Sequence, residues 1–161
     1  MLSASSCSIF LLSCVSISLG SDLSNGWGEH IDWQKFDDAF KIAEEENKPV
    51  MLLIHKSWCG ACKNLKPKFA ESEEIATLSK NFVMVNVMDD DEPEDAKYKP
   101  DGGYIPRILF IDHGDVMKDL YNESGNPKYK YYYHSPDHIM SSMERALKQL
   151  EEGFSHVSDE L

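Results

Sequence analysis

Two cysteines three positions apart, Cys59 and Cys62 in the stretch KSWCGACKNLKPKF, are the residues of this sequence best suited to chemistry. A pair with this spacing can be half of a metal site, a structural cross-link or a redox couple. Zinc needs four Cys or His ligands, and the six histidines are scattered without ligand-like spacing. A disulfide that closes so short a loop constrains the unfolded chain only weakly. The spacing therefore favours a redox couple, and we expect neither a metal nor an organic cofactor.

The segments on either side of the pair indicate where the sulfurs lie. Residues 50–54 form a continuous apolar run that is too short for a helix and is typical of a strand covered on both faces. From Cys62 onward the spacing is helical, with Leu65, Phe69 and Ala70 on one face. We therefore expect the cysteines between the end of a buried strand and the start of a helix.

A sulfur at the start of a helix is expected to be reactive. Free backbone N–H groups and the positive end of the helix dipole stabilise a thiolate, and they would lower the pKa of Cys59 from about 8.5 to roughly 3.5–7.5. Lys56 and Lys63 add positive charge nearby. Cys62, one turn further into the helix, would keep its proton. This asymmetry assigns attack to Cys59 and resolution to Cys62.

The remaining periodic segments predict the other elements. We expect a helix from about Asp32 to Glu46, a short helix around Ile75 and Leu78, and a closing helix that begins at Ser135-Pro136. Three further strands are predicted, the last two joined by a turn at residues 112–115: 82–87, 108–111 and 116–118.

The order of these elements predicts the class of fold. A strand, a helix and a second strand in succession form a parallel right-handed unit, whereas the later hairpin adds antiparallel strands. The expected class is therefore α/β, with a mixed central sheet and helices on both of its faces.

Composition and the ends of the chain indicate a compartment. With 161 residues and a formal net charge of −12, the chain fits one acidic globular domain, and its charge argues against nucleic acid as a partner. Residues 1–20 carry no charged side chain and are typical of a secretory signal peptide, because a membrane anchor would need a longer uninterrupted apolar run. The final S-D-E-L resembles the K-D-E-L and H-D-E-L signals of the endoplasmic reticulum. We expect residence in the lumen of that organelle, a retrieval receptor as partner, and no membrane insertion after signal cleavage.

Signal cleavage would change the cysteine content. It would remove Cys7 and Cys14, so that the mature chain keeps Cys59 and Cys62 in a compartment that permits disulfides. The predicted organisation is a signal peptide, a lead segment, a globular domain and a tail with the retention signal: 1–20, 21–31, 32–152 and 153–161.

Two separated motifs resemble the thioredoxin family. SWCGACKNLKPKF is similar to the W-C-x-x-C active site, including a helix proline, Pro67, eight residues after the first cysteine. Tyr104-Ile105-Pro106 precedes a predicted strand, as the cis-proline of the family does. Longer segments resemble the small single-domain thioredoxins of the endoplasmic reticulum, which are related to the anterior gradient proteins: NKPVMLLIHKSWCGACKNLKPKFAES, PDGGYIPRILF and NPKYKYYY. The resemblance runs from Trp33 to the C-terminus and implies a thioredoxin fold.

The resemblance also implies roles around the sulfurs. Trp58 would cover one side of the pair, with core packing as the alternative. A cis bond at Pro106 would leave the backbone of Ile105 free to bind an extended client chain, the alternative being an ordinary trans proline. Gly60 and Ala61 allow the tight turn but supply neither the imidazolium of an isomerase Gly-His pair nor the ring of thioredoxin's Gly-Pro. We expect a reduction potential between those two, roughly −180 to −270 mV.

One position departs from the family pattern. Thioredoxins and isomerases carry a buried acid six residues before the first cysteine, where it helps to move the proton of the resolving cysteine, and here that residue is Leu53. The proton must leave by another route, through water, Lys56 or His55. Turnover is expected to be slower as a result.

Three further stretches have both a functional and a simpler interpretation. The acidic run 89–95 is favoured as a solvated loop over a loose calcium site, because it lacks EF-hand spacing. The alternating tyrosines suggest an edge strand, and packing is favoured over a client-binding face: Tyr129, Tyr131, Tyr132 and Tyr133. Asn122 begins an N-E-S sequon in a predicted loop and is a glycosylation candidate.

These observations together predict a protein thiol-disulfide oxidoreductase of the endoplasmic reticulum lumen. It would exchange disulfides with client proteins through the Cys59-Gly60-Ala61-Cys62 pair, and the family resemblance adds glutathione as a small-molecule redox partner. The alternative is a client-binding or chaperone-like module in which the redox pair is secondary.

Overall fold

The structure is a computed structural model that describes residues 22–158, with side chains as far as Glu152. The predicted signal peptide and residues 159–161 of the predicted retention signal lie outside the described residues. Within the described part of the chain, no helix is both long enough and apolar enough to cross a membrane.

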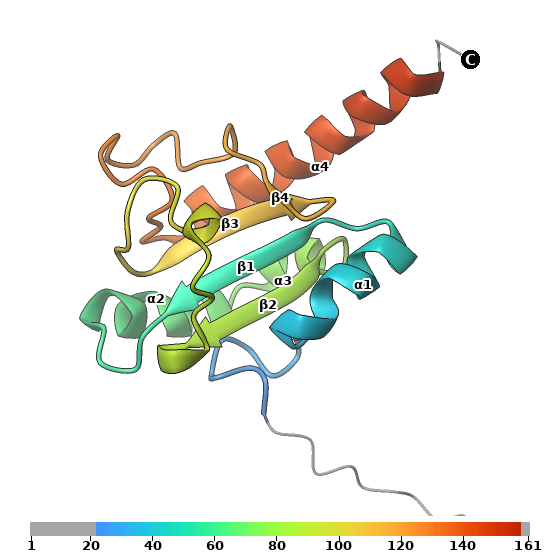
Figure 1. Ribbon diagram of the computed structural model, residues 1–161. Helices are drawn as coiled ribbons and strands as arrows, with labels where there is room; N and C mark the ends of the chain where they lie inside the picture. Colours follow the sequence, from blue (N-terminus) through green and yellow to red (C-terminus); the bar gives the residue numbers. More distant parts are fainter. Residues whose placement is uncertain (1–21, 159–161) are drawn as a thin grey trace, which may run out of the picture.

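A four-stranded sheet with the order β2-β1-β3-β4 forms the centre of the fold (Figure 1). β1 (Val50–His55) pairs in parallel with β2 (Val83–Met88) and antiparallel with β3 (Arg107–Asp112). The short β4 (Asp115–Val116) adds an antiparallel edge beside β3. β1 is buried along its whole length, as its continuous apolar sequence requires. The predicted mixed sheet is confirmed.

Helices cover both faces of this sheet. In Figure 1 the first helix lies in front of the sheet and the other three lie behind it. The helices are α1 (Phe36–Glu46), α2 (Gly60–Ala70), α3 (Glu73–Ser79) and α4 (Pro136–Ser158), and two 3-10 turns follow β2, η1 (Asp89–Asp91) and η2 (Ala96–Tyr98). This arrangement confirms the predicted α/β class.

Alternating side chains of the strands build two hydrophobic clusters, one on each face. One cluster joins Leu53 of β1 to Phe69 of α2 and includes both Cys59 and Cys62. The other joins Leu52, the neighbour of Leu53 on β1, to residues of α1. The cysteines are therefore anchored on the sheet face that α2 and α4 cover.

The beginning of the domain differs from the sequence prediction. The helix expected from Asp32 begins at Phe36, because Trp33 forms a bridge with Met84 beside the sheet. The segment set apart as a lead, residues 21–31, contributes Trp27 to the core, where its ring packs edge-on against Phe69. At the other end, α4 continues to Ser158.

The tyrosine-rich stretch does not form the predicted edge strand. Residues 129–133 run through turns, in which Tyr131 and Tyr133 are buried and Tyr129 is exposed. The Tyr131 hydroxyl donates to the carbonyl oxygen of Lys118 at 2.9 Å, and the Tyr133 hydroxyl donates to Ser142 Oγ at 2.9 Å. These contacts support the packing interpretation for the two buried rings.

Candidate redox site

The chain leaves β1 at His55 and turns directly into α2. The Cys59 N–H donates to the Lys56 carbonyl oxygen at 3.2 Å and closes this turn. Cys59 is the N-cap of α2, and its Sγ accepts a hydrogen bond from the Cys62 N–H at 3.0 Å. The sulfur therefore receives one of the amide groups that the first turn of a helix leaves without an intrahelical partner, as predicted.

Cys59 and Cys62 are joined by a disulfide, with Cα atoms 5.3 Å apart. Cys59 is 5% exposed and Cys62 is 1% exposed, so an incoming sulfur reaches Cys59 first. The attacking role of Cys59 and the resolving role of Cys62 stay predictions.

Trp58 and Gly60, on either side of Cys59 in the chain, are both exposed. Trp58 is 72% exposed, so the alternative that it packs in the core is wrong. Gly60 is exposed, and a Cβ placed there would meet no atom within 4 Å. Ala61 packs partly against the hydrophobic cluster that contains the cysteines.

The Ile105-Pro106 bond is cis, as the family resemblance implied, and the alternative of a trans proline is wrong. The next residue, Arg107, pairs with Ile54 near the end of β1. This pairing brings Pro106 to the same edge of the sheet as the turn that carries the cysteines. Ile105 is half-buried and packs against both hydrophobic clusters.

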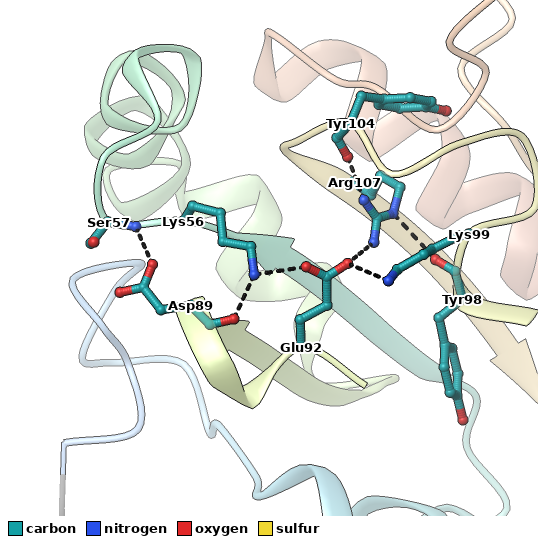
Figure 2. A network of polar contacts seen from close by, with 8 residues as sticks. All are labelled: Lys56, Ser57, Asp89, Glu92, Tyr98, Lys99, Tyr104 and Arg107. Carbon is teal, nitrogen blue, oxygen red and sulfur yellow. Dashed lines mark hydrogen bonds and ion pairs between the residues drawn. The ribbon is translucent and has the colours of Figure 1, made fainter. Parts of the chain in front are cut away.

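Lys56 makes contacts that the sequence did not predict. It was expected to lend positive charge to the Cys59 thiolate, but its Nζ lies 2.7 Å from Glu92 Oε2 and donates to the Asp89 carbonyl oxygen at 2.5 Å (Figure 2). A carboxylate therefore balances its charge. Lys63, the other predicted tuning residue, is exposed on α2 directly after Cys62.

Glu92 and Arg107 are site residues that the sequence interpretation missed. Arg107 is completely buried and donates to Glu92 Oε1 at 2.5 Å. Burial by itself raises the pKa of Glu92, but hydrogen bonds from Lys56 and Arg107 outweigh it and hold the pKa below its ordinary value. The solvated-loop interpretation of residues 89–95 is therefore wrong at Glu92. An arginine at the start of a buried strand was the available signal, since a buried cation needs an acid.

His55 and Leu53 lie on the cysteine side of β1. Leu53 is completely buried in the same cluster as the cysteines, so an apolar side chain occupies the position of the family's acid. His55 is also completely buried, and this burial lowers its pKa to about 4. Of the two side chains considered for the proton of Cys62, His55 is thus a weak base and Lys56 is held in an ion pair.

Asn122 lies in a loop, as predicted, but its side chain is buried there. It is 4% exposed, and its Nδ2, the atom to which a glycan would be attached, donates to the Tyr132 carbonyl oxygen at 2.9 Å. The side chain therefore serves the packing of the loop after β4.

Among the side chains that the structure describes, residues 22–152, no group of three or more His, Cys, Asp or Glu is arranged to hold a metal ion.

The fold and the cysteine pair together define a thioredoxin-fold protein suited to thiol–disulfide chemistry. Residues 32–113 match the family described as Thioredoxin-like, and the chain belongs to this family.

Among curated proteins, the chain is similar to anterior gradient protein 2-B of Xenopus laevis. The two are 36% identical over 133 residues, which cover 81% of this chain and 80% of the relative. Human anterior gradient protein 2 homolog is 35% identical over 134 residues, covering 82% of this chain and 75% of the relative. The chain is thus related to the anterior gradient proteins.

Among solved structures, a DsbH oxidoreductase is similar with a TM-score of 0.54 and 21% identity, covering 73% of this chain and 85% of that chain. At this identity the likeness concerns the fold.

Proposed function

We propose that this protein is a thiol-disulfide oxidoreductase that acts on client proteins in the lumen of the endoplasmic reticulum. One observation carries the proposal: Cys59 Sγ caps α2 and accepts the Cys62 N–H at 3.0 Å, while Cys62 lies one turn deeper. A sulfur held in this way is a good leaving group and a good nucleophile near neutral pH.

In the oxidising direction the reaction has two steps. A client thiolate attacks Cys59 Sγ, the bond between Cys59 and Cys62 breaks, and the Cys62 sulfur takes up a proton. A second client thiolate then attacks the client sulfur of the mixed disulfide, and Cys59 leaves as a thiolate. Two electrons pass from the client dithiol to the protein, and the client gains a disulfide. The reducing direction runs these steps backwards, with Cys59 attacking and Cys62 releasing the client.

The surroundings of the pair support client binding at the same edge of the sheet. We propose that the exposed Trp58 and the backbone of Ile105, next to the cis bond at Pro106, contact an extended client segment. Gly60 places no side chain beside Cys59 that would block the approach of that segment. Glutathione is proposed as the small molecule that resets the pair.

The location is proposed from sequence patterns. The apolar segment 1–20 and the S-D-E-L ending support entry into the endoplasmic reticulum and return by a retrieval receptor. The quoted sequence segments resemble thioredoxin domain-containing protein 12, a small single-domain thioredoxin of that compartment, and we propose that this chain is of the same kind.

Trapping of mixed disulfides tests the function. Cys62→Ala removes the resolving sulfur, so Cys59 should stay covalently joined to client proteins and the adducts should disappear on reduction. Cys59→Ala is the matched control and should trap none. The proposal fails if the Cys62→Ala protein captures no client while Cys59→Ala leaves client binding unchanged.

A client-binding module is the second candidate function, and the exposed aromatic side chains favour it. Trp58 and Tyr129, 72% and 47% exposed, are the exposed large hydrophobic residues of the described part of the chain. If this function is primary, a Cys59→Ala, Cys62→Ala double variant should still suppress aggregation of an unfolded client as well as the wild type does.

A further inference from the structure

One carboxylate touches both loops of the redox site. Glu92 follows η1, and its two oxygens have different partners (Figure 2). Oε2 lies 2.7 Å from Lys56 Nζ, in the turn that leads to Cys59, and Oε1 lies 2.5 Å from Arg107 Nη2, directly after the cis-proline. The side chain of Glu92 is only 12% exposed.

The contact with Lys56 holds the turn before Cys59. The Lys56 carbonyl oxygen accepts the Cys59 N–H, so movement of Lys56 moves the N-cap of α2. Asp89 supports the same turn, because its Oδ1 accepts the Ser57 N–H at 2.8 Å. The segment from Asp89 to Glu92 is therefore the support on which the cysteine turn rests.

The contact with Arg107 holds the loop that carries the cis-proline. Arg107 is completely buried and donates through Nη1 to the Tyr104 carbonyl oxygen at 2.5 Å, and through Nε to the Tyr98 carbonyl oxygen at 3.2 Å. Glu92 is the carboxylate that compensates this buried guanidinium. A purely structural ion pair would need only this contact with Arg107. Glu92 also forms an ion pair with Lys56 in the turn before Cys59.

The carboxylate of Glu92 lies among several positively charged side chains. It lies near three cations, Lys56, Arg107 and, at 3.8 Å, Lys99. Removal of the carboxylate would take a negative charge away from these cations, at the edge of the sheet where Cys59 lies, although Asp89 would still interact with Lys56. Positive charge favours the thiolate form of a nearby cysteine.

We propose that Glu92 is a positioning residue for disulfide exchange. It couples the cysteine turn to the cis-proline loop and lowers the positive electrostatic potential at Cys59. This inference rests on the proposed function, because a positioning role is defined by the exchange reaction. The same contacts make Lys56 part of the coupling, so Glu92 and Lys56 variants should act on Cys59 in opposite directions.

Glu92→Gln is the first test. The substitution keeps the shape of the side chain and removes its charge. Alkylation of reduced Cys59 should have its midpoint shifted to lower pH by about half a unit, which is about threefold in rate at acidic pH. The KM for oxidation of a dithiol client peptide should rise about fivefold while kcat changes less than twofold. Glu94→Gln, which removes the same charge from an exposed neighbour, should leave both quantities at wild-type values.

Lys56→Met keeps the test decisive if Glu92→Gln fails to fold. It leaves the pair of Glu92 and Arg107 intact and removes the cation of the cysteine turn. The alkylation midpoint of Cys59 should shift to higher pH by about half a unit, the reverse of the Glu92→Gln shift, and the KM should again rise. The double variant should return the midpoint close to the wild-type value.

Opposite midpoint shifts in the two single variants support the coupling. The inference is overturned if wild type and Glu94→Gln exchange disulfides and either folded single variant matches them in midpoint and KM. A loss of unfolding free energy with unchanged midpoints also overturns it, because a purely structural contact would behave in that way. If the wild type itself exchanges no disulfide with the peptide, the proposed function fails instead.

Discussion

At the scale of single residues, the contact that supports the proposed reactivity of Cys59 comes from a backbone amide rather than from a charged side chain. The Cys62 N–H donates to Cys59 Sγ at 3.0 Å, whereas Lys56 forms an ion pair with Glu92. The first contact could be predicted, since a cysteine between a strand and a helix occupies the N-cap position. The second could not, because no local periodicity links Lys56 to an acid beyond β2.

The dipeptide between the cysteines gives a residue-scale prediction. Ala61→His should make the protein a stronger oxidant, because an imidazolium near Cys59 stabilises its thiolate and hence the reduced form. A tenfold stabilisation corresponds to about 30 mV, so the reduction potential measured against glutathione should rise by about that amount.

Ala61→Asn is the matched control for Ala61→His. It adds a side chain of polar character without charge and should leave the potential near the wild-type value. Equal potentials for the two variants would contradict the electrostatic explanation.

At the scale of elements, the segment before α1 forms a polar cluster with β2, the end of β1 and α2. Asn25 Nδ2 donates to Asn86 Oδ1 at 2.7 Å, and His55 Nε2 lies 3.2 Å from the same oxygen. Lys66 of α2 donates to the Asn25 carbonyl oxygen at 2.8 Å. The sequence could not predict this cluster, because residues 22–31 have no helical or strand periodicity and were assigned to a lead segment.

The buried His55 predicts a pH dependence of stability. Its pKa is lowered, mainly by burial, from 6.5 to about 4 in the folded protein. Below pH 6.5 the unfolded chain therefore binds a proton that the folded protein does not, and the free energy of unfolding falls as the pH is lowered towards 4. The expected loss from this residue is about 3 kcal/mol, measurable by urea unfolding at several pH values.

His55→Gln should remove this part of the decline, since glutamine does not titrate and can still bond to Asn86. His113→Gln is the control, because the His113 side chain is 79% exposed. Glu92 is unchanged in the wild type and in both histidine variants, so its contribution is the same in all three curves. A decline between pH 6.5 and 4 that is equally steep in the wild type and in His55→Gln would contradict the assignment.

At the scale of the whole molecule, periodicity predicted the α/β class and most elements, because burial on a sheet or a helix imposes a repeat on the sequence. Contacts between segments that are distant in the sequence could not be predicted in the same way. Trp33 joined the sheet instead of α1, and Asn122 turned inward to bond to Tyr132. Both outcomes depend on where the chain returns in space, which a local pattern does not record.

We propose that the fold holds reduced Cys59 as a thiolate near neutral pH and keeps Cys62 protonated. The most direct measurement is the rate of alkylation against pH in reduced Cys62→Ala protein, which retains the backbone N–H at position 62, and in reduced Cys59→Ala protein. The predicted midpoint for Cys59 lies in the range of roughly 3.5–7.5, with Cys62 reacting only in alkaline buffer. Midpoints near 8.5 for both cysteines, as in a free thiol, would contradict the account.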